Sequence, residues 1–450
     1  MSEKIRISQC MIVKNEEKNI ERALSWGRDM MWEQIVVDTG STDRTAAIAQ
    51  EMGAKVFHFP WIDDFSAAKN FAIDQACGDW IAFLDADEYI PPESAKKIPS
   101  LLMKMDSTSC NALITSLVQV DGAQDITQEQ AEGTLKWIST LKEDGSKKFS
   151  LSGSVIRLFR NLPGLRYEGR IHEKLAMKDG SLSCADTSQE LVVLHTGYNP
   201  EEMKEKNKVE RNIHLIKKEL EDHPRDYKML TCLADSYSQQ KNHAKAAKWY
   251  EKAADCLPKG LGEDNIQGAM IFKHLLLIYL ELSDEKAAKK AYARGTKRFP
   301  KDADYDYLMG RHLTGTGHFQ DGAQHLLKAL VLLDQHGSTL RSTLLAHNLL
   351  EAWELLIKCH YENQDLKQCV SCAVTVLKAS PYRPEALKLL LSAFRMDEEL
   401  DRDRPTPTAA SPEQVKGFLG NFYDLGKEED CRFVGDAARQ VSYERLMEFL

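Results

Sequence analysis

The sequence lacks several features that would place it in a common class of protein. Its net charge of −9 and pI near 5.9 show no excess of positive charge, so nucleic acid and anionic membranes are disfavoured as partners. No run approaches the length of about eighteen apolar residues that a membrane span needs, and residues 1–6 have no apolar segment typical of a signal peptide. We therefore expect a cytoplasmic protein without a membrane span.

Glycine-rich phosphate-binding motifs are also missing. The motif G-x-G-x-x-G does not follow the first predicted strand and G-x-x-x-x-G-K-[ST] is absent, which disfavours a dinucleotide dehydrogenase and a P-loop NTPase. Nucleotidyl transfer on a related sheet would need a glycine-rich loop with a basic residue, and residues 11–17 contain none. The ten cysteines form no disulfide framework, and the close pair Cys369 and Cys372 falls in a helical pattern, so we expect reduced, mostly buried thiols.

The N-terminal part of the sequence shows an alternation of predicted strands and helices. A chain of 450 residues is too long for one ordinary core, so two or three domains are expected. Strands are predicted at residues 5–13, 34–37, 53–58 and 80–84. A helix is predicted after each of the first three strands, and the last two of these helices span residues 44–52 and 65–77. This order predicts an α/β domain with a mostly parallel, Rossmann-like sheet and right-handed crossovers.

The predicted strand at residues 80–84 consists of five apolar residues, and acidic residues follow it directly. If the extended conformation continues, Asp85 and Asp87 place both carboxylates on one side, beyond the carboxyl end of the strand. Two hard oxygen donors there suit Mg²⁺ or Mn²⁺, which take further oxygens from a substrate diphosphate. The alternative is that the two acids cap the next helix, before Pro91.

The ends of the other strands also carry polar groups that can bind a nucleotide. The first strand ends in Val13, Lys14 and Glu16, and the second ends in Asp38. An aspartate can accept a hydrogen bond from a base N–H, and a glutamate can accept one from a ribose hydroxyl. Because parallel strands end at the same edge of a sheet, we expect these groups to lie around one nucleotide site.

Four ordered motifs then resemble the family 2 glycosyltransferases of GT-A fold. They are residues 11–17 (MIVKNEE), 37–43 (VDTGSTD), 64–70 (DFSAAKN) and 83–88 (FLDADE). The resemblance implies inverting transfer of a hexose from a nucleotide diphosphate, usually UDP, with Mn²⁺ or Mg²⁺.

By the same likeness, each acidic residue at a strand end has a role. Asp38 would bind the base, Glu16 the ribose, Asp85 the ribose or a metal-bound water, and Asp87 the metal. Where many relatives have a second aspartate after Asp38, this chain has Thr39.

Residues 110–194 are expected to form the acceptor half, with strands at 112–120 and 154–159. An inverting transfer needs a base that removes the proton of the acceptor nucleophile. Glu173 is the preferred candidate, while Glu168, or His172 as base or ligand, remain alternatives.

Three further residues are expected at the site. In related GT-A enzymes a glycine-containing loop precedes the base and a late histidine completes the metal shell, and Gly169 and His195 look similar. The alternative for His195 is a hydrogen bond to a backbone carbonyl at a strand end. Lys69 and Arg170 could neutralise the leaving diphosphate, or be ordinary surface charges.

The second half of the sequence is predicted to be all helical. A helix begins at residues 199–202 and has an apolar stripe from Val209 to Leu220, with charged residues that we expect to be solvated. From Tyr227 onward the spacing of a tetratricopeptide repeat appears; its positions are Leu230, Leu233, Ala234, Tyr237, Ala246, Tyr250, Ala253 and Pro258. The pattern recurs from residue 269 and, more weakly, at 303–333 and 350–381, which predicts a stacked solenoid.

The expected domains are therefore residues 1–199 (GT-A glycosyltransferase), 200–400 (linker helix and repeats) and 401–450. The last comprises a hinge at 401–412 and a helical pair that begins with a capping box from Ser411 to Gln414. This pair caps the array or mediates a homodimer.

Two classes of function fit this organisation. The first is a glycosyltransferase whose repeats present a peptide or protein acceptor. The second is a non-catalytic scaffold with a domain that senses a nucleotide sugar. The set of Asp85, Asp87, Glu173 and His195 favours the enzyme, because a scaffold does not need all four. A glycan or lipid acceptor stays open, as does the acceptor atom: hydroxyl oxygen, cysteine sulfur or glycan hydroxyl.

Overall fold

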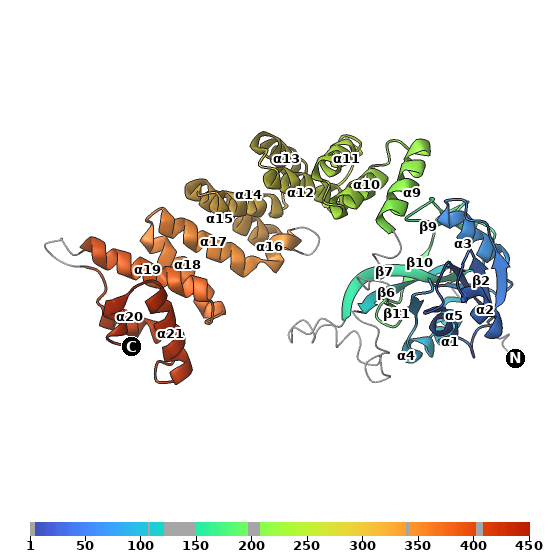
Figure 1. Cartoon of the computed structure of the whole chain (residues 1–450), viewed down its shortest axis with the longest axis horizontal. Helices are drawn as coiled ribbons and strands as arrows, with labels where there is room; N and C mark the ends of the chain where they lie inside the picture. The colour runs from blue at the N-terminus through green and yellow to red at the C-terminus, as the bar shows by residue number, and fades with distance from the viewer. Residues whose placement is uncertain (1–4, 107–108, 121–148, 197–207, 339–341, 402–407) are drawn as a thin grey trace. The chain divides into compact units, whose positions relative to one another are not determined.

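The computed structural model describes residues 5–106, 109–120, 149–196, 208–338, 342–401 and 408–450. The chain divides into two compact units, Met1–Pro224 and Arg225–Leu450. The first is an α/β unit and the second is all helical, as the sequence predicts (Figure 1). Within the described ranges, no helix is long and apolar enough to cross a membrane.

The predicted strand–helix alternation builds one half of the sheet in the first unit. Strands β1 (Ile7–Val13), β2 (Glu33–Asp38), β3 (Lys55–His58) and β4 (Trp80–Phe83) are parallel and lie in the order β3-β2-β1-β4. Helices α1 (Ile20–Ser25), α2 (Thr45–Glu51) and α3 (Phe65–Asp74) connect them. Asp64 caps α3, because its carboxylate accepts a hydrogen bond from the backbone N–H of Ala67 at 2.9 Å.

Strand β4 lies inside the sheet and is buried on both faces. Trp80 and Ala82 pack into one apolar cluster, whereas Ile81 and Phe83 pack into another. Each of these four residues is at most 1% exposed. Because alternate side chains of a strand point to opposite faces, a strand between two apolar layers has a continuous apolar sequence.

The other half of the sheet is mixed. Strand β7 (Phe149–Arg160) is antiparallel to β4 and to β6 (Ala112–Val120), and β11 (Val192–His195) is parallel to β6. The short strands β5 (Glu88–Tyr89) and β10 (Cys184–Asp186) pair with β11 and β6. Helices α4 (Pro92–Ala95) and α5 (Ile98–Asp106) follow β5 in the chain. Since β6 and β11 run in the same direction as β4, β11 ends at the same edge as β1, β2 and β4.

Two more elements of the first unit bear on the site. Strands β8 (Leu165–Glu168) and β9 (Lys174–Met177) form a separate hairpin whose loop contains residues 169–173. Helix α9 (Lys208–Asp222) buries Ile213, Leu215, Ile216 and Leu220. The expected boundary after residue 199, and the predicted helix start at 199–202, lie outside the described residues. The observed boundary after Pro224 places α9 with the first unit rather than with the repeats.

The second unit consists of stacked helical hairpins. They are α10 (Tyr227–Gln239) with α11 (His243–Asp255), α12 (Ile266–Glu281) with α13 (Glu285–Arg298), α14 (Asp304–Gly315) with α15 (Phe319–His336), and α17 (Leu349–Glu362) with α18 (Leu366–Ala379). The short α16 (Thr343–His347) precedes α17, and α19 (Pro384–Asp401) follows α18. The four hairpins confirm the predicted tetratricopeptide solenoid.

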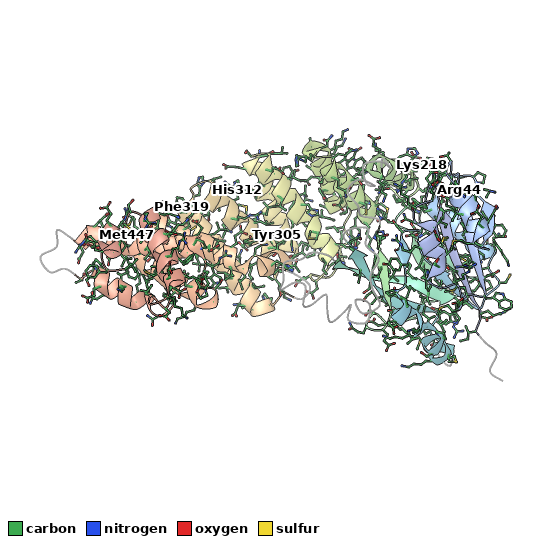
Figure 2. All side chains as sticks on the ribbon, turned by 60° about the horizontal axis from the view of Figure 1, so that its bottom comes forward. Arg44, Lys218, Tyr305, His312, Phe319 and Met447 are labelled. Atoms are coloured by element: carbon green, nitrogen blue, oxygen red, sulfur yellow. The ribbon has the colours of Figure 1, made fainter. Side chains whose placement is uncertain are left out.

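The core of this unit contains the residues that define the repeat pattern. Ala246, Tyr250 and Ala253 are at most 1% exposed. Tyr305, which Figure 2 labels, is fully buried, and its hydroxyl donates a hydrogen bond to the carbonyl oxygen of Ala269 at 2.9 Å. All ten cysteines are free thiols, and five of them, among them Cys369 and Cys372 in α18, are buried. The expectation that most are buried is met for half of them.

The chain ends in α20 (Pro412–Leu419), α21 (Glu428–Gln440) and α22 (Glu444–Met447). Ser411 and Gln414 form the predicted capping box. Residues 402–407 of the expected hinge lie outside the described residues. The N–H of Ala409 donates a hydrogen bond to the carboxylate of Asp401 at 2.7 Å, so the two described sides of this segment are joined. Residues 401–450 belong to the second compact unit.

Candidate active site

The predicted polar strand ends lie around one cavity of about 820 Å³ in the first unit. Its lining residues are Ile12, Val13, Lys14, Asn15, Glu16, Thr39, Trp61, Phe65, Lys69, Asp85, Ala86, Asp87, Arg157, Ile171, His172, Glu173, His195, Lys208, Arg211 and Asn212. This is the carboxyl edge of the parallel strands, where open α/β sheets bind ligands.

Asp85 and Asp87 both line the cavity, but not through a continued strand. The extended conformation ends after Leu84, and a turn follows in which the N–H of Glu88 donates to the carbonyl oxygen of Asp85 at 3.0 Å. The alternative that the two acids cap the next helix is wrong, because Pro91 is the N-cap of α4 and no side chain caps that helix. The turn therefore directs both acids toward the cavity.

Asp87 lies beside His195, the last residue of β11. His195 Nε2 is 3.3 Å from Asp87 Oδ2, and His195 Nδ1 is 2.8 Å from the amide oxygen of Gln119 on β6. Since an amide oxygen only accepts, Nδ1 carries the proton and Nε2 faces Asp87. Burial lowers the pKa of His195, but the neighbouring carboxylate of Asp87 raises it more, so the pKa lies above its ordinary value.

This pair suits a divalent cation. Mg²⁺ binds oxygen at about 2.0–2.1 Å in an octahedron, so two adjacent ligands are separated by about 3.0 Å. The 3.3 Å between His195 Nε2 and Asp87 Oδ2 is close to that separation. No cluster of three or more His, Cys, Asp or Glu side chains that could hold a metal occurs among the described residues. Mg²⁺ commonly keeps waters and takes one or two protein ligands plus substrate phosphates, so a pair of ligands is sufficient.

Asp85, the other predicted metal ligand, contacts cations instead. Its two carboxylate oxygens lie 3.5 Å from Lys69 Nζ and 3.5 Å from Arg157 Nη2. Burial raises the pKa of Asp85, but the charges of Lys69 and Arg157 lower it more, to about 2. The structure thus places Asp85 in an ion-pair network beside the Asp87–His195 pair.

Lys69 joins this network to the predicted base. Its ammonium lies 2.6 Å from Glu173 Oε1, and it faces the rings of Phe83 and Tyr167 at 5.2 and 5.1 Å. Burial lowers the pKa of Lys69, whereas the charges of Asp85 and Glu173 raise it more, so it stays protonated. Lys69 was predicted to neutralise a leaving diphosphate, but the structure shows its charge paired with two carboxylates.

Helix α3 also fixes the loop that carries the base candidates. The Asn70 amide donates to the carbonyl oxygen of Tyr167 and accepts from its N–H, both at 2.9 Å. The N–H of Phe65 donates to the carbonyl oxygen of Arg170 at 2.9 Å. Gly169 has a φ of +96°, which a glycine adopts without strain. The motif at residues 64–70 therefore holds the loop that carries the base candidates in place.

The three base candidates occupy different positions. Glu173 and His172 line the cavity, and His172 has a φ of +54°. Glu168 is exposed on β8 and does not line it. The geometry therefore favours Glu173 or His172 over Glu168.

Arg170 does not reach the cavity either. Its Nη2 donates to Asp222 at 3.0 Å, its Nη1 lies 4.0 Å from Asp64, and its N–H donates to Glu219 at 2.9 Å. Both Asp222 and Glu219 are on α9. The expectation that Arg170 contacts a diphosphate is replaced by a role in attaching α9.

The nucleotide side of the cavity is built from two loops that hydrogen-bond to each other. The N–H of Asn15 donates to Ser41 Oγ at 2.9 Å, and the N–H of Thr42 donates to Asn15 Oδ1 at 2.8 Å. The N–H of Glu16 donates to Thr45 Oγ1 at 2.8 Å. These bonds hold Lys14 and Glu16 at the cavity wall.

Asp38 lies next to this wall rather than in it. Its carboxylate accepts hydrogen bonds from the N–H groups of Gly40 and Ser41 and lies 3.4 Å from His58 Nδ1. Thr39 lines the cavity in its place.

Sequence reasoning missed Arg157 and Glu88. Arg157 Nε and Nη2 donate to the two carboxylate oxygens of Glu88, both at 2.7 Å, and Glu88 also accepts from the N–H of Asp85 at 3.1 Å. Burial lowers the pKa of Arg157, but Glu88 raises it more, so it stays charged. The available signal was Arg157 between apolar residues in the second half of β7, since a charge inside a buried strand needs a partner.

The cavity wall contributed by α9 was also missed. Lys208, Arg211 and Asn212 line the cavity, whereas the sequence pattern predicted solvated charges on this helix. These three residues could not be found from sequence periodicity, because their position at the cavity depends on contacts of α9 with distant loops.

Comparisons with known proteins agree with this architecture. Residues 8–156 match the family model "Glycosyl transferase family 2", and residues 206–260 match "Tetratricopeptide repeat". A TPR repeat-containing protein of Synechococcus elongatus is 31% identical over 304 residues, which cover 66% of this chain and 67% of that protein. The SPbeta prophage-derived glycosyltransferase SunS of Bacillus subtilis is 29% identical over 222 residues, 49% of this chain and 46% of SunS. The chain thus spans two thirds of the first relative and less than half of the second.

Two solved structures are similar at low identity. The S. aureus TarS 1-349 complex with UDP-GlcNAc is 17% identical, with a TM-score of 0.33, over 66% of this chain and 90% of TarS. The TPR protein YrrB is 15% identical, with a TM-score of 0.34, over 50% of this chain and 97% of YrrB. Because both TM-scores are below 0.5, the assignment rests on the sequence matches and the fold described above. The chain therefore carries a family 2 glycosyltransferase domain, followed by tetratricopeptide repeats.

Proposed function

We propose that this glycosyltransferase is an inverting, metal-dependent enzyme that moves a hexose from a nucleotide diphosphate, UDP, to a peptide or protein acceptor. The observation that carries the proposal is that the Asp87–His195 pair and Glu173 line one cavity. A cation site and a carboxylate base are the two groups that such a transfer needs. The choice of uridine follows the family resemblance.

In the proposed reaction, the acceptor hydroxyl or thiol gives its proton to the carboxylate of Glu173. The acceptor atom forms a bond to the anomeric carbon while the bond from that carbon to the diphosphate oxygen breaks on the opposite face, which inverts the configuration. The departing diphosphate keeps the electron pair. A divalent ion held by Asp87 and His195 would neutralise part of that charge. Lys69 positions Glu173 at 2.6 Å and joins it to the Asp85 turn.

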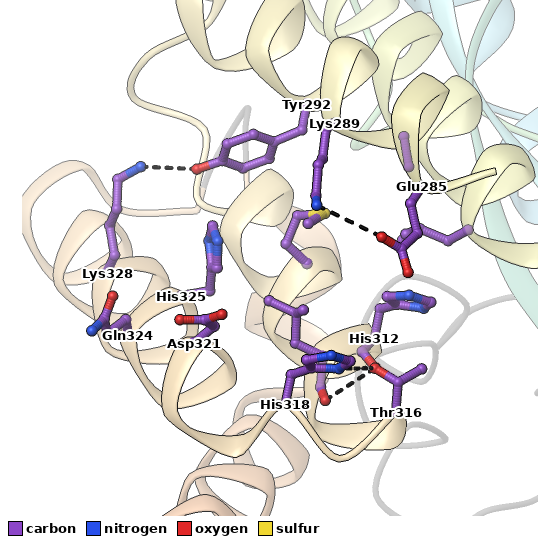
Figure 3. Close-up of a pocket in the computed structure, with 14 residues that line it drawn as sticks. Glu285, Lys289, Tyr292, His312, Thr316, His318, Asp321, Gln324, His325 and Lys328 are labelled. Atoms are coloured by element: carbon purple, nitrogen blue, oxygen red, sulfur yellow. Dashed lines mark hydrogen bonds and ion pairs between the residues drawn. The ribbon is translucent and has the colours of Figure 1, made fainter. Parts of the chain in front are cut away.

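We place the acceptor-binding surface on the repeat unit. A cavity of about 420 Å³ opens between α13, α14 and α15 (Figure 3). Leu280, Met309 and Leu313 give it an apolar base, and Tyr292 and His325 stand at its polar edge. A concave apolar site with a few fixed polar groups suits one side chain of a bound peptide.

The polar edge is fixed from behind by a buried carboxylate. Asp306, whose side chain is 1% exposed, accepts hydrogen bonds from the hydroxyl of Tyr292 at 2.7 Å and from Nδ1 of His325 at 2.8 Å. Lys328 Nζ lies 2.9 Å from the other oxygen of Asp306 and donates to the Tyr292 hydroxyl at 3.1 Å. These groups keep their positions without a ligand, so binding needs little reordering.

The test is incubation of the purified chain with a panel of UDP-, GDP-, ADP- and dTDP-sugars and Mn²⁺. We expect slow hydrolysis of a UDP-hexose, measured as released UDP. Early proton NMR spectra should show the anomer opposite to that of the donor. Release from a different nucleotide would overturn the uridine assignment, and retention of configuration would overturn the inverting mechanism.

A further inference from the structure

Helix α9 is attached to the loops that build the cavity. Lys218 forms an ion pair with Asp63, in the loop before α3. In the same C-terminal part of the helix, Glu219 accepts a hydrogen bond from the N–H of Arg170 at 2.9 Å, and Asp222 pairs with the Arg170 guanidinium at 3.0 Å. Figure 2 labels Lys218 on this helix. With contacts to both loops, α9 presents a fixed face to the cavity.

That face carries Lys208, Arg211 and Asn212. Residues three and four apart lie on the same side of a helix, and all three line the cavity. The Arg211 guanidinium lies 5.3 Å from the centre of the Phe65 ring, and its Nη2 donates to Asn212 Oδ1 at 3.3 Å. Stacking on an aromatic ring and a bond to a neutral amide orient the guanidinium and leave its charge uncompensated.

Two cations that lie deeper in the cavity have carboxylate partners. Lys69 pairs with Asp85 and Glu173, and Arg157 pairs with Glu88. No carboxylate among the described residues forms an ion pair with Arg211. Arg211 is exposed to solvent, and partial desolvation lowers its pKa.

We propose that Arg211, together with Lys208 and Asn212, forms an anion subsite on α9 that binds the diphosphate of the nucleotide-sugar donor. This inference rests on the proposed function, because it assigns residues to the leaving group of that reaction. A guanidinium can bind two phosphate oxygens at once, which suits a diphosphate better than a single point charge does.

The chemistry of the leaving group suits a cation that has no carboxylate partner among the described residues. As the bond to the anomeric carbon breaks, negative charge increases on the diphosphate. An arginine already paired with a carboxylate would gain little from that change, whereas Arg211 has its full charge available. The subsite lies beyond residues 8–156, which match the family model, and belongs to a helix that connects the catalytic unit to the repeats.

The experiment is calorimetric titration of the full chain with UDP and with inorganic pyrophosphate, both with Mn²⁺, and ligand-observed NMR of uridine. Arg211→Gln should weaken UDP and pyrophosphate binding by about 10- to 100-fold, because a charge-assisted bond is lost. Uridine binding should not change. Arg211→Lys keeps the charge but not the planar guanidinium, so its affinity for UDP and pyrophosphate should lie between those of the wild type and of Arg211→Gln.

The matched control is Lys217→Gln, which removes a positive charge from an exposed position of the same helix outside the cavity. It should bind UDP and pyrophosphate as the wild type does. Arg211→Gln should also keep the wild-type unfolding midpoint, which excludes misfolding as the cause.

The inference is overturned if Arg211→Gln binds both ligands like the wild type, or if uridine binding falls by the same factor. It is also overturned if Lys217→Gln weakens binding equally. Pyrophosphate binding that depends on Arg211, without turnover of any nucleotide sugar in the panel, would support the subsite and contradict the proposed donor.

Discussion

The ammonium of Lys69 lies 2.6 Å from the carboxylate of Glu173. The same ammonium lies 3.5 Å from Asp85, so one side chain of α3 links the base candidate to the acidic turn after β4. Glu173 comes from the β8–β9 loop and Asp85 from the turn after β4, and the shared ammonium fixes their separation before a substrate binds. Preorganised charges of this kind contribute to catalysis because they need no rearrangement during the reaction.

The first prediction concerns the base. Glu173→Gln keeps the shape and a hydrogen-bonding oxygen but cannot take a proton at neutral pH. Turnover should fall about 10²- to 10⁴-fold while the affinity for the donor stays nearly unchanged. Glu168→Gln is the matched control, because Glu168 is exposed and outside the cavity, and should have nearly wild-type kcat. If Glu173→Gln has wild-type activity and His172→Ala is inactive, His172 is the base.

The same variant reports the acceptor atom. A thiol has a pKa near 8.5 and is partly ionised without a base, so a cysteine acceptor would allow the rate of Glu173→Gln to recover as pH rises. A hydroxyl acceptor would show little recovery between pH 7 and 9, because its proton stays bound in that range. The measurement is kcat against pH for the wild type and the variant.

The second prediction concerns the cation. UDP should raise the melting temperature clearly with Mn²⁺ or Mg²⁺ and only weakly without it, and Asp87→Asn should remove most of the metal-dependent part. Gln119→Leu should weaken Mn²⁺ binding about 10- to 100-fold, because Gln119 orients His195 through the 2.8 Å bond to Nδ1. Without metal, UDP should raise the melting temperature of Gln119→Leu by the same amount as that of the wild type. Equal UDP shifts with and without metal in the wild type would remove the metal from the mechanism.

Local sequence patterns predicted those parts of the site that belong to single strand ends. Asp87 and Glu16 lie just beyond the ends of apolar strands, and parallel strands bring their ends to one edge. The repeat unit was predictable for a similar reason, since each hairpin has its own apolar spacing.

The parts that were not predicted depend on pairing between distant segments. Arg157 and Glu88 lie far apart in the chain and meet only because β7 is antiparallel to β4. Likewise, Arg170 could be read as a diphosphate ligand until α9 supplied Asp222 and Glu219 as its partners. Hydrophobic periodicity gives the buried face of α9 but not which loop its charged face contacts.

The third prediction concerns stability and pH. Glu33 is buried in β2 and accepts hydrogen bonds from Ser8 Oγ at 2.7 Å, from Cys77 N–H at 2.6 Å and from Lys55 Nζ at 2.7 Å. Burial raises the pKa of Glu33, but these bonds lower it more, so the folded-state pKa is below the unfolded value. The stabilisation is therefore present above the unfolded pKa of about 4.3 and is lost as pH falls through the folded pKa.

Glu33→Gln should accordingly cost about 1–3 kcal/mol of the free energy of unfolding at pH 7, and the difference from the wild type should shrink as pH falls below 4.3. Urea unfolding followed by tryptophan fluorescence would measure it, with Trp249 and Trp353 of the second unit replaced by phenylalanine. Glu51→Gln is the control, since Glu51 is exposed, and should cost less than about 0.5 kcal/mol. A difference independent of pH would contradict the assignment.

The last prediction concerns the boundary between the units. A chain of residues 1–224 keeps α9 on the catalytic unit and should fold, bind UDP with Mn²⁺ and hydrolyse the donor at nearly the rate of the full chain. A chain of residues 1–199 loses α9, which exposes the surface that Ile213, Ile216 and Leu220 cover and removes Arg211, so it should aggregate or bind UDP at least about 10-fold more weakly. Both truncations lack the repeats, and both should therefore lose transfer to a macromolecular acceptor. Full transfer by residues 1–224 would contradict a role of the repeats in presenting the acceptor, and wild-type UDP binding by residues 1–199 would contradict the role of α9.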